Sequence, residues 1–140
     1  MNGRFFLDTN IFVYSFDERA RGKARRAAEL IRRALESGKG TISYQVVQEF
    51  FNVALRRFAK PMSVAEAEQY LGTVFRPLLT VHSSQNLFAE ALRLANRYQL
   101  GWFDALIVAS AAEGECSIFY TEDMQHGLEV GRLRVVNPFL

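Results

Sequence analysis

The sequence offers little that would support a disulfide scaffold, a zinc site or a membrane segment. Its 140 residues include one cysteine, Cys116, which excludes an internal disulfide and a cysteine-based zinc site. The two histidines, His82 and His126, do not form a pair at helical spacing. No apolar run approaches the length of a membrane span, and the run near the N-terminus is cut by Asp8, too early for the apolar core of a signal peptide. We therefore expect a soluble protein of the reducing cytoplasm.

What is present fits one globular domain over residues 1–140. The chain is 49% hydrophobic and 23% charged, and it shows no internal repeat or low-complexity linker. The net charge of +2 is mild, but basic residues crowd the segment 19–33. That crowding permits a polyanionic partner, although a solvated helix face is the commoner meaning of such a segment.

Strand-like and helix-like patterns alternate along the chain. Apolar runs predict strands near 5–7, 41–43, 79–81, 118–120 and 133–136, and apolar residues at helical spacing predict helices over 24–35, 45–58, 63–75, 87–98 and 105–112. Gly38 should end the first helix in a left-handed conformation, Ser63 and Glu66 match a capping box, and Pro77 should stop the third helix. The helix over 105–112 is apolar on nearly every side, as expected of a helix buried by its neighbours. The alternation predicts an α/β domain with a parallel sheet.

Asp8 follows the first apolar run, where the predicted strand ends. Open α/β sheets bind ligands at the carboxyl ends of their strands. Asp8 is therefore either a helix or turn cap, with Asn10 beside it, or the first member of an acidic site. This segment alone leaves both interpretations open.

Three more carboxylates are expected at the same edge. Asp123 follows a predicted strand, Glu49 begins the second turn of a helix that follows another, and Asp104 lies in the opening turn of the buried helix. Each has an ordinary structural explanation. Asp123 could be a turn or cap residue, Glu49 an exposed helical residue, and Asp104 a partner of the helix dipole. Asp104 shares its stripe with apolar residues, so its carboxylate should point inward unless a cleft meets it there. The shared edge favours a common role.

Clustered carboxylates repel one another. Two full charges about 5 Å apart cost roughly 3 kcal/mol at an effective dielectric of about 20, so such a cluster either takes up protons or holds a cation. Oxygen ligands without cysteine clusters or histidine pairs favour a hard ion, Mg²⁺ or Mn²⁺. Hard ions at an open carboxylate site support metal-assisted phosphoryl hydrolysis.

Four segments carry a resemblance to a known family. They are Leu-Asp-Thr-Asn at 7–10, Ser-Tyr-Gln-Val-Val-Gln-Glu-Phe-Phe-Asn-Val at 43–53, Trp-Phe-Asp-Ala-Leu-Ile-Val-Ala at 102–109 and Tyr-Thr-Glu-Asp-Met-Gln-His-Gly at 120–127. Together, and in this order, they resemble a PIN-domain ribonuclease, most closely the VapC-type toxins of bacterial toxin–antitoxin pairs. The resemblance implies a three-layer α/β/α sandwich around a short parallel sheet and Mg²⁺- or Mn²⁺-dependent endonucleolytic cleavage of RNA.

The resemblance also assigns roles to particular residues. By position, the acidic quartet is Asp8, Glu49, Asp104 and Asp123, and the supporting polar residues are Thr9, Asn10 and Thr121. We expect the first three acids to position one Mg²⁺, and Asp123 to hold a second ion or orient the attacking water. Glu122 is next to Asp123 in the sequence, and either carboxylate could point into the acidic site. The position of Asp123 in the motif favours Asp123.

The expected partners are RNA, a cognate antitoxin protein and a second copy of the chain. Arginines and lysines of the 19–33 segment, with Arg56, Arg57 and Lys60, are candidates to guide the RNA backbone. The resemblance implies that the antitoxin lies in an apolar groove between helices. Candidates for its lining are Phe51, Phe58, Tyr70 and Phe75, although aromatic residues at helical spacing are more often core.

Other readings make different predictions. Phosphatases with an aspartyl nucleophile also place Asp after the first strand. They need a second Asp two residues later, where this chain has Asn10, and a lysine in the late segment, where this chain has none suitably placed. A catalytically inactive protein-binding module, whose acidic residues only cap helices and turns, is the non-enzymatic alternative. His126 follows Asp123 by three residues, but an exposed or capping role is favoured over a metal ligand.

Overall fold

The computed structural model describes residues 3–140, which are organised around a six-stranded sheet in the order β3-β2-β1-β4-β6-β5. The strands are β1 (Arg4–Leu7), β2 (Gly40–Ser43), β3 (Leu79–Val81), β4 (Cys116–Tyr120), β5 (Glu129–Val130) and β6 (Leu133–Val136). Neighbouring strands are parallel except that β5 pairs antiparallel with β6. The predicted parallel sheet is confirmed, and the short edge strand β5 is an addition that the sequence pattern did not indicate.

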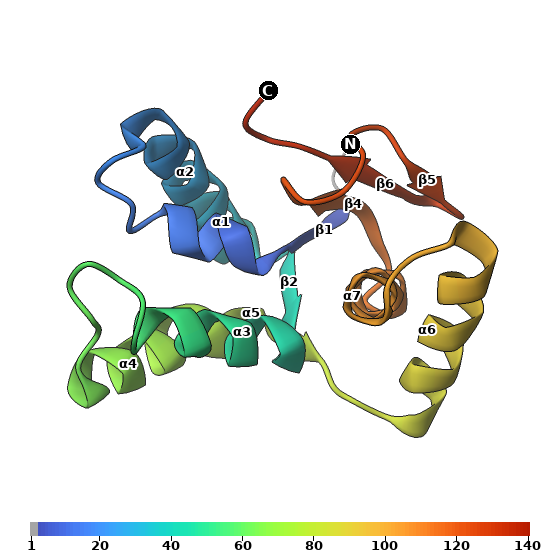
Figure 1. The fold of residues 1–140 in the computed structure, drawn as a ribbon, viewed down its shortest axis with the longest axis horizontal. Helices are drawn as coiled ribbons and strands as arrows, with labels where there is room; N and C mark the ends of the chain where they lie inside the picture. Colours follow the sequence, from blue (N-terminus) through green and yellow to red (C-terminus); the bar gives the residue numbers. More distant parts are fainter. Residues whose placement is uncertain (1–2) are drawn as a thin grey trace.

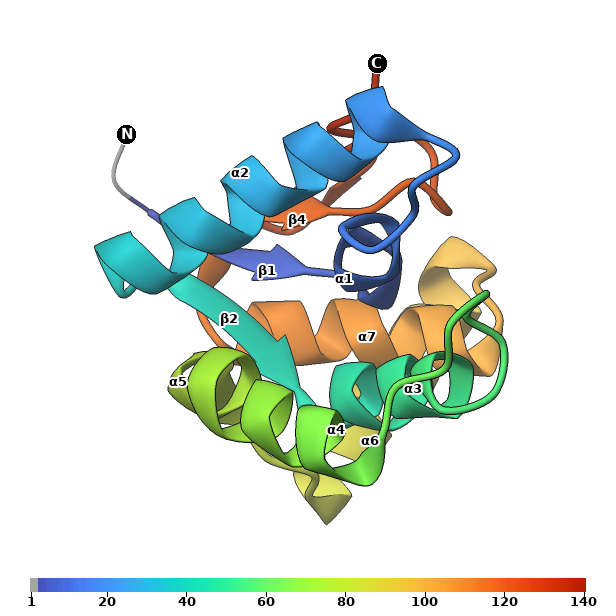
Figure 2. The same cartoon turned by 90° about the vertical axis from the view of Figure 1, so that its left-hand side faces the viewer.

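Helices cover both faces of the sheet. They are α1 (Thr9–Tyr14), α2 (Arg21–Ser37), α3 (Tyr44–Ala54), α4 (Val64–Tyr70), the π-helical turn η1 (Leu71–Phe75), α5 (Arg76–Leu78), α6 (Gln85–Tyr98) and α7 (Trp102–Glu113). Figure 1 shows α1 to α5 on one side of the sheet and α6 and α7 on the other, and Figure 2 views the molecule from the α2 side. Right-handed connections require this arrangement, because the chain moves from β1 to β3 in one direction and then returns to β4. The three-layer α/β/α prediction is confirmed.

The close approach of α2 and α5 to the sheet depends on Gly40 at the start of β2. A Cβ atom at this position would lie 2.2 Å from the Ala34 Cβ of α2 and 3.2 Å from the Leu78 Cδ2 of α5. Because the first contact is far shorter than van der Waals separation, any side chain here would push α2 away from the sheet.

Local signals place several helix ends where the sequence predicted them. Gly38 ends α2 with φ 69°, the left-handed conformation that glycine adopts without strain. Ser63 and Glu66 form the predicted capping box at the start of α4. The prediction that Pro77 stops the third helix is wrong: α5 continues directly from η1, and the helical backbone runs past Pro77 to Leu78.

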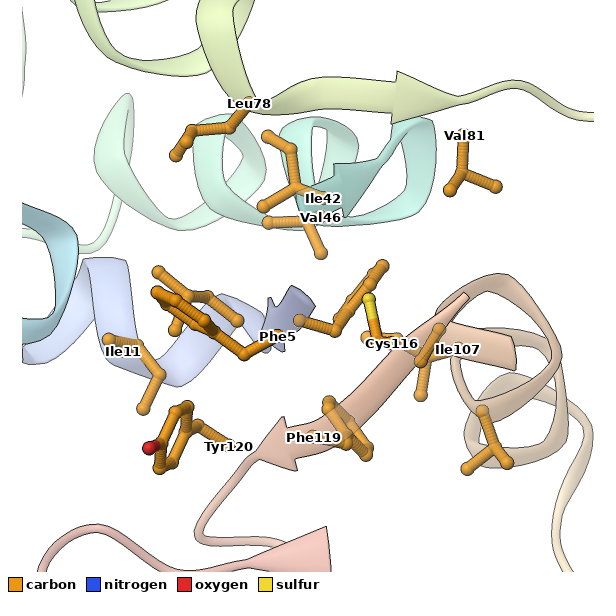
Figure 3. Close-up of a cluster of buried hydrophobic side chains, with 14 of the residues drawn as sticks. Phe5, Ile11, Ile42, Val46, Leu78, Val81, Ile107, Cys116, Phe119 and Tyr120 are labelled. Atoms are coloured by element: carbon orange, nitrogen blue, oxygen red, sulfur yellow. The ribbon is translucent and has the colours of Figure 1, made fainter. Parts of the chain in front are cut away.

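The core lies between the sheet and its two helical layers. Phe6 and Phe119, on the adjacent central strands β1 and β4, are fully buried and meet edge to face with ring centroids 5.6 Å apart. Figure 3 shows Ile42, Val46 and Ile107 converging on the same region from β2, α3 and α7. As predicted, α7 is buried on most sides. Truncation of Phe119 to alanine would cost about 3–5 kcal/mol.

No helix within residues 3–140 is both long enough and apolar enough to cross a membrane.

Candidate active site

The acidic residues gather where the sheet order reverses. β1 lies between β2, to which the chain runs first, and β4, which it adds after passing to the opposite face. Asp8 directly follows β1, and Thr121 and Asp123 follow β4. The carboxyl edge at such a switch point is where helices diverge and leave room for a ligand.

Asp8 is both a helix cap and a buried member of this group. Its Oδ1 accepts a hydrogen bond from the Thr9 backbone N at 2.7 Å, which caps α1, and its Oδ2 accepts one from Thr121 Oγ1 at 2.6 Å. Burial raises the pKa of Asp8 from 3.8 to about 6, the two hydrogen bonds oppose that rise, and the charges of Asp123 and Glu49 add to it. The two interpretations of Asp8 are therefore compatible.

Glu49 is held by two neutral donors. Thr9 Oγ1 donates to Glu49 Oε1 at 2.7 Å, and Gln45 Nε2 donates to Glu49 Oε2 at 3.2 Å. The side chain is half-buried on α3. Thr9 thus links two carboxylates, because its backbone N binds Asp8 while its hydroxyl binds Glu49.

Asp123 is exposed and is positioned from α1 and β4. Asn10 Nδ2 donates to Asp123 Oδ2 at 3.0 Å and lies 3.4 Å from Thr121 Oγ1. Thr121 Oγ1 also accepts from the Asp123 backbone N at 3.1 Å. The three polar residues proposed as supports, Thr9, Asn10 and Thr121, all contact predicted acidic residues.

Asp104 faces solvent in the first turn of α7. The sequence predicted that this carboxylate would point into the protein unless a cleft reached it. The inward-pointing alternative is wrong, because Asp104 is exposed. Partial burial raises the pKa of Asp104, and the charges of Asp123 and Glu49 raise it further. Asp104 thus lies within electrostatic reach of Asp123 and Glu49, although it comes from a different element.

Glu122 belongs to another cluster. Tyr14 donates its hydroxyl to Glu122 Oε1 at 2.6 Å, and Lys23 Nζ contacts Glu122 Oε2 at 2.6 Å. The hydrogen bonds from Lys23 and then Tyr14 lower the pKa of Glu122. Its neighbour Asp123 is instead held by Asn10, so consecutive acidic residues have different partners.

The donors at this edge fit a hard divalent cation in chemistry. Asp8, Glu49, Asp104 and Asp123 supply oxygen only, and the buried Asn10 Oδ1 and Gln45 Oε1 have no hydrogen-bond partner within the described residues. Buried acceptors without partners are costly, and water molecules bound to a cation would satisfy them. Within residues 3–140, however, no three acidic, histidine or cysteine side chains form a preformed ligand cluster.

The two histidines have partners outside the acidic group. His126 Nδ1 accepts from the Asn137 backbone N at 3.0 Å, which agrees with the capping role that the sequence favoured. His82 Nδ1 lies 2.6 Å from the Tyr44 hydroxyl. The residue that sequence reasoning missed is Gln45, although its position four residues before Glu49 is a recognisable helical spacing.

Comparison with known proteins gives one family match. The model of a family described as "PIN domain" matches residues 5–127. A search of curated proteins finds no match.

Several solved structures share this fold. A chain of a toxin–antitoxin complex from Klebsiella pneumoniae is 23% identical, with a TM-score of 0.66, 95% of this chain covered and 96% of that chain. A chain of FitAcB from Neisseria gonorrhoeae is 15% identical, with a TM-score of 0.63 and coverage of 96% and 98%. A chain of VapBC2 from Rickettsia felis, bound to a DNA fragment from its promoter, is 18% identical, with a TM-score of 0.58 and coverage of 94% and 96%. At these identities the likeness shows the fold.

Proposed function

Because the chain belongs to the PIN-domain family, we propose that it is a Mg²⁺- or Mn²⁺-dependent endoribonuclease whose residues 1–140 form a single cytoplasmic nuclease domain. The observation that carries this proposal is electrostatic. Burial raises the pKa values of Asp8 and Asp104, the charges of Asp123 and Glu49 raise both further, and neither shift has a lysine or arginine among its causes. A group of acids without a basic partner is what a metal-dependent phosphodiesterase requires.

We assign the roles as follows. Asp8, Glu49 and Asp104 would hold one ion, and Asp123 would hold a second ion or orient the attacking water. A bound ion supplies Lewis-acid stabilisation of the phosphodiester and a more acidic water. Thr121 and the Thr9 backbone N hold the Asp8 carboxylate in place, while Thr9 Oγ1 fixes Glu49.

The first test is calorimetric titration of Mn²⁺ into wild type and Asp8→Asn, followed by cleavage assays on RNA. We expect saturable binding in wild type that the variant loses, together with cleavage that EDTA stops. If wild type binds no Mn²⁺ at millimolar concentration, the acidic residues are caps, and the inactive protein-binding module becomes the better account.

Exposed basic residues support an RNA substrate. Several basic residues of the 19–33 segment are paired with acids, among them Lys23 with Glu122. Arg21 and Arg25 on α2 are exposed, as are Arg56, Arg57 and Lys60 after α3. Binding of a non-cleavable RNA to these residues would weaken steeply as salt rises, because phosphate contacts release counterions. A flat salt response would remove this assignment.

An apolar groove supports an antitoxin partner. It has a volume of about 450 Å³ and lies between α2 and the α4–η1 segment, where Ile31, Leu35, Tyr70 and Val74 line it. Of the four aromatic residues that the sequence suggested for such a groove, only Tyr70 is among its lining residues, and Phe75 is fully buried in the core. We propose that an amphipathic segment of the antitoxin binds here. Val74→Asp should release a co-expressed antitoxin while Mn²⁺ binding persists.

A second copy of the chain is the third proposed partner. Large apolar side chains are exposed where α6 meets α7: Phe88, Leu92 and Trp102, with Phe103 beside them. The rings of Phe88 and Trp102 lie 5.9 Å apart, and Leu92 follows Phe88 by one helical turn on α6, so we propose that a symmetric dimer covers this surface. Leu92→Arg should convert a dimer to a monomer in light scattering, and a wild-type monomer would exclude this interface.

A further inference from the structure

Gln45 connects two of the elements that carry acidic residues. It is the second residue of α3 and is 8% exposed. Its Nε2 donates to Glu49 Oε2 at 3.2 Å, one turn along the same helix, and to the Phe103 backbone O at 3.1 Å in the first turn of α7. Since Asp104 directly follows Phe103, one amide group ties the Glu49 carboxylate to the turn that bears Asp104.

The other acidic residues have their own supports. Asp8 is fixed by Thr9 and Thr121, and Asp123 by Asn10. The start of α7 is different, because its N-cap is Gly101, which offers no side-chain hydrogen bond. Gln45 supplies a side-chain contact to this turn from a neighbouring helix.

The chemistry of the link explains why glutamine suits it. A primary amide has two N–H donors on one nitrogen, and here one serves a carboxylate while the other serves a carbonyl. A lysine or arginine would supply donors but would also neutralise Glu49 and compete with a cation. A serine or threonine hydroxyl has only one donor. Glutamine therefore holds two acceptors at a fixed separation without changing the net charge of the site.

We propose that Gln45 is a positioning residue that sets the separation of Glu49 and Asp104 for metal binding. The proposal rests on the metal-dependent nuclease function proposed above. Groups that orient metal ligands typically change metal affinity or activity by about 10–100-fold when they are removed.

The test compares Gln45→Met with Gln48→Met. Methionine keeps the length of glutamine but lacks both its Nε2 donors and its Oε1 acceptor. Gln48 is exposed on the same helix, so it is the matched control. Mn²⁺ affinity is measured by calorimetry, the metal concentration for half-maximal RNA cleavage is measured separately, and Tm is measured in EDTA. We expect Gln45→Met to weaken Mn²⁺ binding about tenfold, with kcat largely restored by excess metal. Gln48→Met should match wild type.

Three outcomes separate the possibilities. If Gln45→Met lowers Tm but binds Mn²⁺ like wild type, Gln45 only packs the helices together and the proposal is wrong. If the variant equals wild type in all measurements, the link has no role and the proposal is wrong as well. If wild type itself neither binds Mn²⁺ nor cleaves RNA, the failure lies with the proposed function.

Discussion

A group of carboxylates at the sheet edge and the single carboxylate of Glu122, beside it in the sequence, behave in opposite ways. At the carboxyl edge of β1 and β4, burial and neighbouring negative charges raise the pKa values of Asp8 and Asp104. In the Glu122 cluster, Lys23 and Tyr14 lower the pKa of Glu122. Glu122 and Asp123 are adjacent in sequence, yet only Asp123 adds to the repulsion on Asp8.

The difference teaches what makes a carboxylate available to an ion. Glu122 already has a lysine partner, so a metal ion would gain little by binding it. Asp8, Glu49 and Asp123 are held by neutral hydroxyl, amide and backbone donors that fix them without cancelling their charge, and Asp104 adds a fourth, exposed carboxylate. Their mutual repulsion is relieved only by a proton or a cation. Four measurements test this contrast.

The largest expected effect is on cleavage. Asp123→Asn should reduce RNA cleavage at least about a hundredfold, the scale seen when one preorganised charge-stabilising group is lost. Glu122→Gln, one residue away, should stay within a few-fold of wild type because its partners are Lys23 and Tyr14. Equal losses in the two variants, measured as initial rates on one RNA, would abolish the distinction between the groups.

The next effect is on stability and its pH dependence. A raised folded-state pKa means that folding favours protonated Asp8, so wild type loses stability as pH rises from the unfolded value of 3.8 through about 6. The loss approaches about 3 kcal/mol before relaxation is considered. Asp8→Asn has no such titration. In EDTA, the Tm of Asp8→Asn should therefore rise relative to the Tm of wild type between pH 4 and pH 7. At pH 7 it should equal or exceed the wild-type Tm. If the variant has a clearly lower Tm at pH 7, Asp8 is a structural carboxylate.

Adding metal should restore the stability that wild type loses as pH rises. At about 100 times its Kd, Mn²⁺ would stabilise the folded chain by about 2.7 kcal/mol. Thermal denaturation should show this gain in wild type and in Glu122→Gln, and not in Asp8→Asn. A gain that survives in Asp8→Asn would place the ion elsewhere.

The smallest effect concerns the Glu122 cluster and has the opposite pH dependence. A lowered folded-state pKa contributes stability above the unfolded value of 4.5, and this contribution is lost as pH falls through the folded value. Glu122→Gln should lower Tm by a few degrees at most near pH 7, because exposed ion pairs contribute little. The difference should disappear in acid. A difference that grows in acid would contradict the assigned direction.

Much of the fold could be predicted because local signals agree with it. Gly38 marks a helix end, Ser63 and Glu66 mark a helix start, and the apolar surround of α7 indicates burial. The short helix α1 was not predicted, since its apolar and aromatic residues follow Asp8 without a clear helical pattern. The prediction for Pro77 failed because α4, η1 and α5 follow one another without a break, so the proline lies one residue before the helical end at Leu78.

The site was harder to predict than the fold. Spacing and strand ends indicated which acids share an edge, but not which donors hold them. Whether Glu122 or Asp123 joins the site depends on Lys23, which lies 99 residues from Glu122. Gln45 was overlooked because its second acceptor is a backbone carbonyl on α7, 58 residues away. Contacts at such separations come from tertiary packing, which a single sequence does not display.

The hydrogen bond from Thr121 to Asp8 joins residues 113 positions apart. The ribosome makes Asp8 and Glu49 early, while β4, the strand that lies beside β1, is made only after α7. A growing polypeptide therefore lacks the complete β4 until residue 120 has been added, and it lacks the complete set of acids until residue 123 has been added. The proposed nuclease site would therefore be complete only after β4 has been made and has paired with β1.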